Sequence, residues 1–449
     1  MKYLALLLAA GAALPAEQFV TGQAARAVIG QRTFTRQEPG ASQVLVGSVS
    51  GLALANDTLF VVDGSRVQAF PQNNRVLIYR NVSTDLPGAD ASIPWDEARR
   101  CPLCGGASDT VLGQPDFEKT EIGTGARSFR TPTAVATDGR VLAVADTDNN
   151  RVLIWTSIPT SNGEPANVVI GQQDFNATAI NAGNGSQVNE RGLRGPQGVW
   201  IDQRGRLWVA DTQNNRVLMW NEIPRANGAP ATLVLGAPDM TTFVEVDLTR
   251  AQFNATATNL LNPVSVTVDP SDRVFVSDLG HNRVLVWNSL PTRNAQPADF
   301  ALGQPDTSST QDRPAQNANN SQFLCQSNGT AANGNPTYPE LCEATLNFPR
   351  FALSDGKQLF VADGGNNRVL VYNTIPTRNG QPADIILGQP TATLNLDATG
   401  DPNSLARRLS SADSVRTPMA LAWDGTNLYV SDPFNRRIMV WTTGDLPLP

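Results

Sequence analysis

Short apolar runs alternate with turn residues along almost the whole chain, and the runs recur in groups of four. In the clearest group, which starts at Pro196, they read GVWI, RLWVAD, RVLMW and ATLVLG. Valine, leucine, isoleucine and tryptophan dominate these runs, while glycine, asparagine, aspartate and proline fill the gaps, as turns require. Apolar stripes with a helical period are absent. The pattern therefore predicts an all-β chain made of four-stranded units.

One ten-residue phrase, DTDNNRVLIW, begins at Asp146 and returns four times in related form. The other copies begin at Asp211, Asp278, Asp363 and Asp432. Each copy lies within a longer unit that opens at an aligned proline, namely Pro132, Pro196, Pro263, Pro349 or Pro418. A sixth, degenerate unit starts near Gly51. Four short antiparallel strands per repeat are typical of a propeller blade, so six units predict a six-bladed β-propeller.

The two ends of the chain predict how this ring closes. The last unit stops at VWTTGDLPLP and lacks a fourth strand, whereas a run of fourth-strand type, AVIGQRTF, occupies Ala27–Phe34. We expect the N-terminal strand to complete the last blade and to cover an edge that would otherwise pair with other chains. Residues 17–449 then form one propeller domain. Its expected blades are about 51–117, 131–175, 195–240, 262–307, 348–392, and 417–449 with 27–34.

These units resemble NHL repeats, in a variant that carries NNRVLVW and VLGQPDF segments. The resemblance covers nearly the whole chain after the first sixteen residues, and it implies the propeller fold. It implies little about function. Family members that bind RNA do so through basic surfaces, and this chain is acidic.

The N-terminal sequence MKYLALLLAAGAALPAEQF has the pattern of a secretory signal. Lys2 gives a basic start, Tyr3–Leu14 is apolar, and Ala16 is a small residue before a cut. We therefore expect a signal peptide over residues 1–16 and a secreted or periplasmic protein. The apolar stretch is shorter than the about 20 residues that span a bilayer, and no later run is longer, so no membrane span is expected.

The net charge of −7, from 34 basic and 41 acidic residues, argues against a nucleic-acid partner, whose phosphates need a basic surface.

Four cysteines fit an exported protein with local disulfides. Cys101 and Cys104 form CPLC, and Cys325 and Cys342 bracket an Asn-rich segment. A redox pair at CPLC and a four-thiolate zinc site are the alternatives. The strand order puts the two pairs on opposite faces of the ring, and zinc needs all its thiolates at about 2.3 Å, so two separate disulfides fit better. The sequence does not fix the pairing.

The aspartate and arginine of the repeated phrase are predicted to be structural, because functional sites rarely occur in equivalent copies. The aspartate ends the second strand of a blade, and the arginine opens the third strand and can reach back to it. The predicted pairs are Asp146 with Arg151, Asp211 with Arg216, Asp278 with Arg283, Asp363 with Arg368, and Asp432 with Arg437.

Two chemical alternatives arise within the same phrase. Asp146, Asp148 and Asn150 could bind calcium, although a bidentate glutamate at the right spacing is missing. His281, the only histidine, replaces a turn asparagine and is expected to be solvated rather than catalytic. No other metal or cofactor, and no catalytic residue, is predicted.

Departures from the repeat are the expected places for function. The loops between second and third strands, and the inserts between blades, should open on one face, which we call the top face. Loops on a rigid scaffold are common binding sites. The inserts are 118–130, 176–194, 241–261, 308–347 and 393–416.

Four arginines are expected near the top mouth of the central channel. Arg130, Arg194 and Arg416 each lie two residues before an aligned proline, and Arg350 follows Pro349. Guanidinium groups suit carboxylates and sulfates, so the cluster predicts an anion site. The alternative is that each arginine forms a weak local ion pair on the surface.

We therefore expect a binding or interaction module whose top-face loops contact a protein, a glycan or a small anion. The rival is a lactonase-like or lyase-like enzyme with a metal in the channel. A third possibility is a passive element of an envelope or matrix. Acidic or polar side chains that converge beside a metal would favour the enzyme, and a channel lined by small apolar residues would favour the module.

Overall fold

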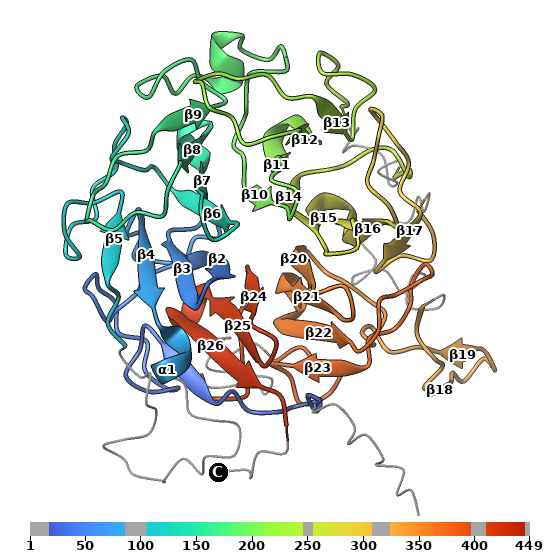
Figure 1. The fold of residues 1–449 in the computed structure, drawn as a ribbon. Helices are drawn as coiled ribbons and strands as arrows, with labels where there is room; N and C mark the ends of the chain where they lie inside the picture. The colour runs from blue at the N-terminus through green and yellow to red at the C-terminus, as the bar shows by residue number, and fades with distance from the viewer. Residues whose placement is uncertain (1–17, 86–105, 246–254, 308–323, 397–409, 445–449) are drawn as a thin grey trace, which may run out of the picture.

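The computed structural model describes residues 18–85, 106–245, 255–307, 324–396 and 410–444. Six four-stranded antiparallel sheets stand as blades around a central axis (Figure 1). The innermost strand of each blade lies beside the axis and the outermost strand at the rim. The predicted all-β, six-bladed propeller is confirmed. Residues 1–17, which include the expected signal peptide, lie outside the described residues.

The strands of each blade, from the axis outward, are as follows. Blade 1 contains β2 (Val49–Ala55), β3 (Thr58–Asp63), β4 (Arg75–Arg80) and β5 (Thr110–Leu112), with helix α1 (Val82–Asp85) after β4. Blade 2 contains β6 (Pro132–Thr137), β7 (Leu142–Asp146), β8 (Arg151–Trp155) and β9 (Val168–Ile170). Blade 3 contains β10 (Gly198–Ile201), β11 (Leu207–Asp211), β12 (Arg216–Trp220) and β13 (Leu233–Leu235).

Blade 4 contains β14 (Pro263–Val268), β15 (Val274–Asp278), β16 (Arg283–Trp287) and β17 (Phe300–Leu302). Blade 5 contains β20 (Pro349–Ser354), β21 (Leu359–Asp363), β22 (Arg368–Tyr372) and β23 (Ile385–Leu387). Blade 6 contains β24 (Leu421–Trp423), β25 (Asn427–Asp432) and β26 (Arg437–Thr442), and its outermost strand is β1 (Ala27–Ile29).

The N-terminal strand closes the ring, as the sequence predicts. β1 pairs antiparallel with β26, with Val28 opposite Met439, and both residues are fully buried. Ring closure also extends upstream of β1. Thr21 Oγ1 accepts a hydrogen bond of 3.2 Å from the Ile386 amide in blade 5. At four other junctions an asparagine side chain caps the fourth strand of the preceding blade in this way, for example Asn379 on Ala301 at 2.8 Å.

The hydrophobic core lies between neighbouring blades, where the faces of adjacent sheets pack together. The aromatic residue that ends each third strand packs into this core. Trp155, Trp287 and Trp441 are almost fully buried. The indole N–H groups of Trp155 and Trp287 donate to a carbonyl of the loop that follows, whereas that of Trp441 donates to the Gln23 carbonyl of the N-terminal segment at 2.8 Å. The N-terminal segment thus fills the place of a third-to-fourth-strand loop.

The insert between blades 4 and 5 carries a disulfide between Cys325 and Cys342. This bond confirms one of the two expected disulfides. It closes the base of a small hairpin, β18 (Gly329–Thr330) and β19 (Pro336–Thr337), which stands outside the ring (Figure 1). Cys101 and Cys104 lie outside the described residues.

Candidate functional site

Six aspartate–arginine pairs join the second and third strands of the blades, and all twelve side chains are fully buried. In blade 3, Arg216 Nε donates to Asp211 Oδ2 at 2.8 Å. The rest of that guanidinium donates to carbonyl oxygens of the flanking inserts, at Met240, Asn189 and Gly192. A buried charge is tolerated when it is paired and hydrogen-bonded in this way. The remaining pairs are Asp63–Arg75, Asp146–Arg151, Asp278–Arg283, Asp363–Arg368 and Asp432–Arg437.

The same contacts show that the inserts end in a shared way. The Arg194 amide donates to Asp211 Oδ1 at 2.7 Å, and the Arg416 amide donates likewise to Asp432 at 2.9 Å. Each insert therefore wraps its last turn over the aspartate–arginine pair, which places the inserts and the second-to-third-strand turns on one face. Sequence reasoning missed this recurrence because main-chain groups make the contacts, so the residue types vary.

The carboxylates of the repeated turn are engaged by the protein itself. Asp146 Oδ2 accepts from Arg151 at 2.7 Å and from Asn149 at 2.8 Å, while Asp148 pairs with Arg66 at 3.1 Å. Burial raises the pKa of Asp146 to about 6, against the pull of Arg151. Guanidinium and amide groups of the protein thus contact Asp146 and Asp148, and calcium binding at Asp146, Asp148 and Asn150 stays a prediction.

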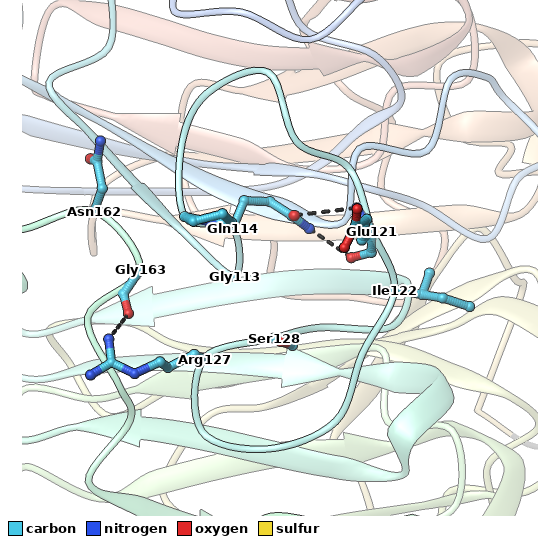
Figure 2. A pocket seen from close by; sticks show the side chains of 9 residues that line it. Gly113, Gln114, Glu121, Ile122, Arg127, Ser128, Asn162 and Gly163 are labelled. Atoms are coloured by element: carbon cyan, nitrogen blue, oxygen red, sulfur yellow. Dashed lines mark hydrogen bonds between the residues drawn. The ribbon is translucent and has the colours of Figure 1, made fainter.

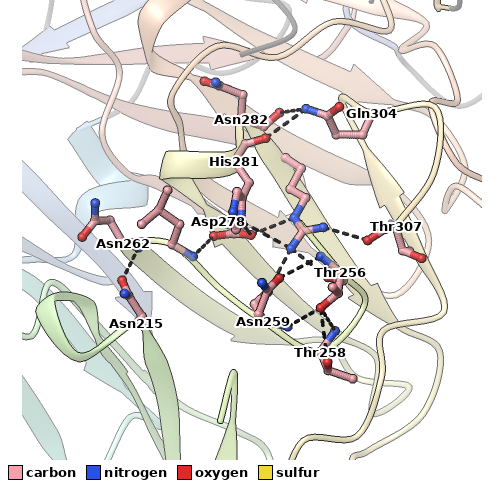
Figure 3. Close-up of polar contacts among 12 residues, drawn as sticks. Asn215, Thr256, Thr258, Asn259, Asn262, Asp278, His281, Asn282, Gln304 and Thr307 are labelled. Atoms are coloured by element: carbon pink, nitrogen blue, oxygen red, sulfur yellow. Dashed lines mark hydrogen bonds and ion pairs between the residues drawn. The ribbon is translucent and has the colours of Figure 1, made fainter. Parts of the chain in front are cut away.

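His281 takes the place of the turn asparagine in blade 4 and is buried, so the expectation that it is solvated is wrong. Its Nδ1 lies 2.8 Å from Asp278 Oδ2, where the other blades place an asparagine amide (Figure 3). Burial acts to raise the pKa of Asp278, but His281 and Arg283 outweigh it and hold that pKa below its usual range. The histidine is thus a member of the buried network.

Replacing His281 with asparagine should make blade 4 resemble the other blades. In the wild type the lowered pKa of Asp278 contributes stability above its unfolded pKa of about 3.9, and this stability is lost as the pH falls through the folded pKa. We expect H281N to be less stable than the wild type at pH 7 and the difference to shrink as the pH approaches 3. Urea unfolding across this pH range measures it. A difference that grows toward low pH would contradict this role.

A hollow with a volume of about 350 Å³ lies between blades 1 and 2 (Figure 2). Its polar side chains already hold the loops in place. The Gln114 amide binds the main chain of Glu121, Arg127 donates to the Gly163 carbonyl, and Asn162 Oδ1 accepts from Val111. A ligand would find few free polar groups there, so we do not place the candidate site in this hollow.

A second cavity lies at the upper end of the central channel. It is lined by residues at the starts of the six inner strands and has a volume of about 20 Å³, roughly the space for one water molecule. Small or apolar residues dominate the lining, together with Thr133, Gln197 and Arg350. This is the lining that favours a binding module over a channel enzyme.

The register of the inner strands is irregular where they line the cavity. In blades 2, 4 and 5 the register of the first two strands shifts at the residue after the aligned proline, which is Thr133, Val264 or Arg350. Bulges re-aim a side chain and recur beside functional sites. In these three blades the residue at the register shift is also a residue of the cavity lining.

Arg350 is the charged side chain in this lining. Among the described residues it has no hydrogen-bond or ion-pair partner, and its Nε is sealed from solvent without an acceptor. Burial lowers the pKa of Arg350 to about 10, so it remains protonated at neutral pH. Its stem lies against Gly364, where a Cβ atom would come within 2.7 Å of Arg350 Cγ.

The other three predicted arginines lie elsewhere on the top face. Arg130, Arg194 and Arg416 are absent from the cavity lining, and their amides are bound to the aspartates of the repeated turns, away from the axis. The Arg416 guanidinium lies 4.3 Å from the centre of the Phe434 ring. The structure thus brings Arg350 alone of the four into the cavity lining, and a role for Arg130, Arg194 and Arg416 near the mouth stays a prediction.

In the part of the chain that the structure describes, no group of three or more acidic, histidine or cysteine residues is arranged to hold a metal ion. Across the same residues, no helix has the length and apolar character needed to cross a membrane.

The fold and the closed ring define the protein as a six-bladed β-propeller. The NHL repeat family model matches residues 193–218, which include the Asp211–Arg216 pair. The chain is thus a six-bladed propeller that carries an NHL repeat in blade 3, and the other blades repeat the same aspartate–arginine turn.

Solved structures resemble the chain at low sequence identity. A protein of unknown function from Bacteroides thetaiotaomicron shares 12% identity over 92% of this chain and 74% of its own, with a TM-score of 0.44. An auxiliary nutrient binding protein from the same organism shares 10%, over 93% and 76%, with a TM-score of 0.45. Virginiamycin B lyase from Staphylococcus aureus shares 9%, over 88% and 95%, with a TM-score of 0.37. These similarities concern the fold alone. No curated protein sequence matches the chain.

Proposed function

We propose that this protein is an exported binding module that holds an anionic group of its ligand at the upper mouth of the channel. The observation that carries the proposal is the buried, unpaired Nε of Arg350 in a narrow, otherwise uncharged lining. A buried donor without a partner costs about 1–3 kcal/mol, so the free protein gives up stability at this position. An anion on the guanidinium would recover it.

The surrounding geometry supports a binding role. The six repeated aspartate–arginine pairs are buried and bonded to each other within the blades. Arg350 is therefore the charged group in the cavity lining. The cavity is too small for a whole substrate, but it admits the tip of a ligand whose body lies on the top-face inserts. The sequence-based expectation of an exported protein fits a module that meets its ligand outside the cell.

Arg350→Met is the variant that tests the proposal. Thermal unfolding of the wild type should shift upward with at least one member of a panel of carboxylates, sulfate, phosphate, and carboxylated and sulfated glycans. Ligand at about 100 times its Kd adds roughly 2.7 kcal/mol to the unfolding free energy. R350M should lose this shift. Arg204→Met, at an exposed arginine on the opposite face, should keep it.

A shift that survives in R350M, or one that R204M also loses, would place the binding elsewhere and overturn the proposal. An absence of any shift would do the same and would favour the passive structural element.

A further inference from the structure

Two aromatic side chains from blades 3 and 5 meet beside the cavity that Arg350 lines. Phe351 lines the cavity and meets Trp200 of blade 3 edge to face, with ring centroids 6.5 Å apart. Gly198, next to the cavity, already lies so close to the Val264 carbonyl that a Cβ atom would come within 2.7 Å of it. The small volume of the cavity therefore limits entry to the end group of a ligand, with the rest of the ligand above.

The size and charge of the cavity limit what the entering group can be. About 20 Å³ is roughly the space of one water molecule, so only the terminal charged group of a ligand can enter, and the atoms that follow lie at the opening. Arg350 brings one positive charge, and the neighbouring side chains Thr133 and Gln197 are neutral. Arg350 balances the charge of a singly charged group. A doubly charged group would lose its hydration and keep one negative charge unbalanced, and this costs free energy.

The shape of the guanidinium and the apolar part of the lining add two further constraints. A guanidinium binds a planar carboxylate through two parallel hydrogen bonds. Val264 and Met419 stand in the same lining and offer apolar contact to whatever carries the carboxylate. A tetrahedral anion would need more donors than this lining provides.

We propose that the channel mouth is a receptor for a monocarboxylate with an apolar body, whose carboxylate pairs with Arg350 and whose first carbons contact Val264 and Met419. This inference rests on the proposed function, since it names the class of anion that the same site takes. A free short-chain acid and the carboxyl end of a larger molecule share this chemistry.

Gly364 is inferred to position Arg350. The arginine stem lies across this glycine in the blade 5 turn, and a side chain there would displace it. In blade 2 the equivalent turn residue is Thr147, and its hydroxyl lies 2.7 Å from that of Thr133. Blade 5 thus differs from blade 2 at both positions, with Arg350 in place of a threonine and Gly364 in place of a threonine.

Isothermal titration of the full chain with acetate, propionate, butyrate and hexanoate tests the proposal, with butyramide, sulfate and phosphate as comparisons. The affinity is expected to rise from acetate to butyrate by roughly fourfold per methylene group, the ratio that burying about 0.8 kcal/mol per CH₂ implies. Butyramide should not bind. R350M should weaken butyrate at least about tenfold. Gly364→Ala should weaken it while leaving the guanidinium in the protein, and R204M should match the wild type.

The outcomes separate the two proposals. If sulfate or phosphate binds more tightly than butyrate and R350M removes that binding, the anion site stands and the monocarboxylate inference is overturned. If butyramide binds as well as butyrate, the carboxylate is not recognised and the inference is again overturned. If no anion binds through Arg350, both proposals fail. The inference is supported if the wild type binds butyrate and both G364A and R350M weaken that binding. Comparing a peptide that has a free terminal carboxylate with the same peptide as an amide then tests whether the carboxyl end of a larger molecule also binds.

Discussion

A chain that begins at Gln31 is expected not to form a monomeric propeller. A chain that begins at residue 18 is expected to form one. The shorter chain lacks β1, so the buried edge of β26 would be exposed along its whole pairing with Val28 and its neighbours. It also lacks Phe19, which is buried against Phe360 and Trp423. Together these losses should exceed about 5 kcal/mol, the low end of the stability of a folded domain.

Size-exclusion chromatography with light scattering and urea unfolding measure this result. We expect soluble oligomers or aggregates without a cooperative transition, because an open strand edge pairs with other chains. A peptide of residues 18–34 added in trans should restore a monomer-sized complex by adding its strand to the edge, and a scrambled peptide should not. A monomeric truncated chain with an unchanged unfolding midpoint would show that the ring does not depend on this strand.

Arg216→Met is expected to lower the free energy of unfolding by about 3–5 kcal/mol, because it leaves Asp211 buried and unpaired. Three carbonyl oxygens of the inserts also lose their donor. Burial already raises the pKa of Asp211 in the presence of Arg216, so the carboxylate has little to hold its charge once the guanidinium is gone. Urea unfolding measures the loss.

Two comparison variants separate the contribution of the hydrogen-bond network from that of the positive charge. Arg216→Lys retains a cation but cannot supply the same fork of donors, so it should recover only part of the loss. Arg204→Met removes an arginine whose side chain is 66% exposed and should cost no more than about 1 kcal/mol. A loss below 1 kcal/mol in R216M would mean that the repeated pair is not a main source of stability.

The sequence predicts the fold well because the fold depends on features that repeat. The sequence alone shows the alternating apolar runs, the Asp–Arg turn and the displaced fourth strand. Each appears in the structure at the expected place. The pairing of Cys325 with Cys342 comes from the structure, since the sequence places both in one insert but does not fix their partners.

The site is harder to predict because its determinants are geometric. The sequence identifies Arg350, but it gives equal weight to Arg130, Arg194 and Arg416. The structure places Arg350 in the cavity lining at a register shift after Pro349, and the residue types there do not indicate that shift. His281 was within reach of sequence reasoning, since it stands where the other copies have an asparagine that binds the aspartate.

The central claim is that Arg350 is held in the channel for a ligand and not for the fold. Urea unfolding of the wild type and R350M, each with and without the tightest-binding anion of the panel, tests it most directly. Without ligand, R350M should be more stable by about 1 kcal/mol or more, because the unsatisfied buried donor is gone. With saturating ligand the order should reverse, since only the wild type gains stability. If R350M is instead the less stable protein without ligand, and the anion leaves both curves unchanged, Arg350 serves the fold and the claim is wrong.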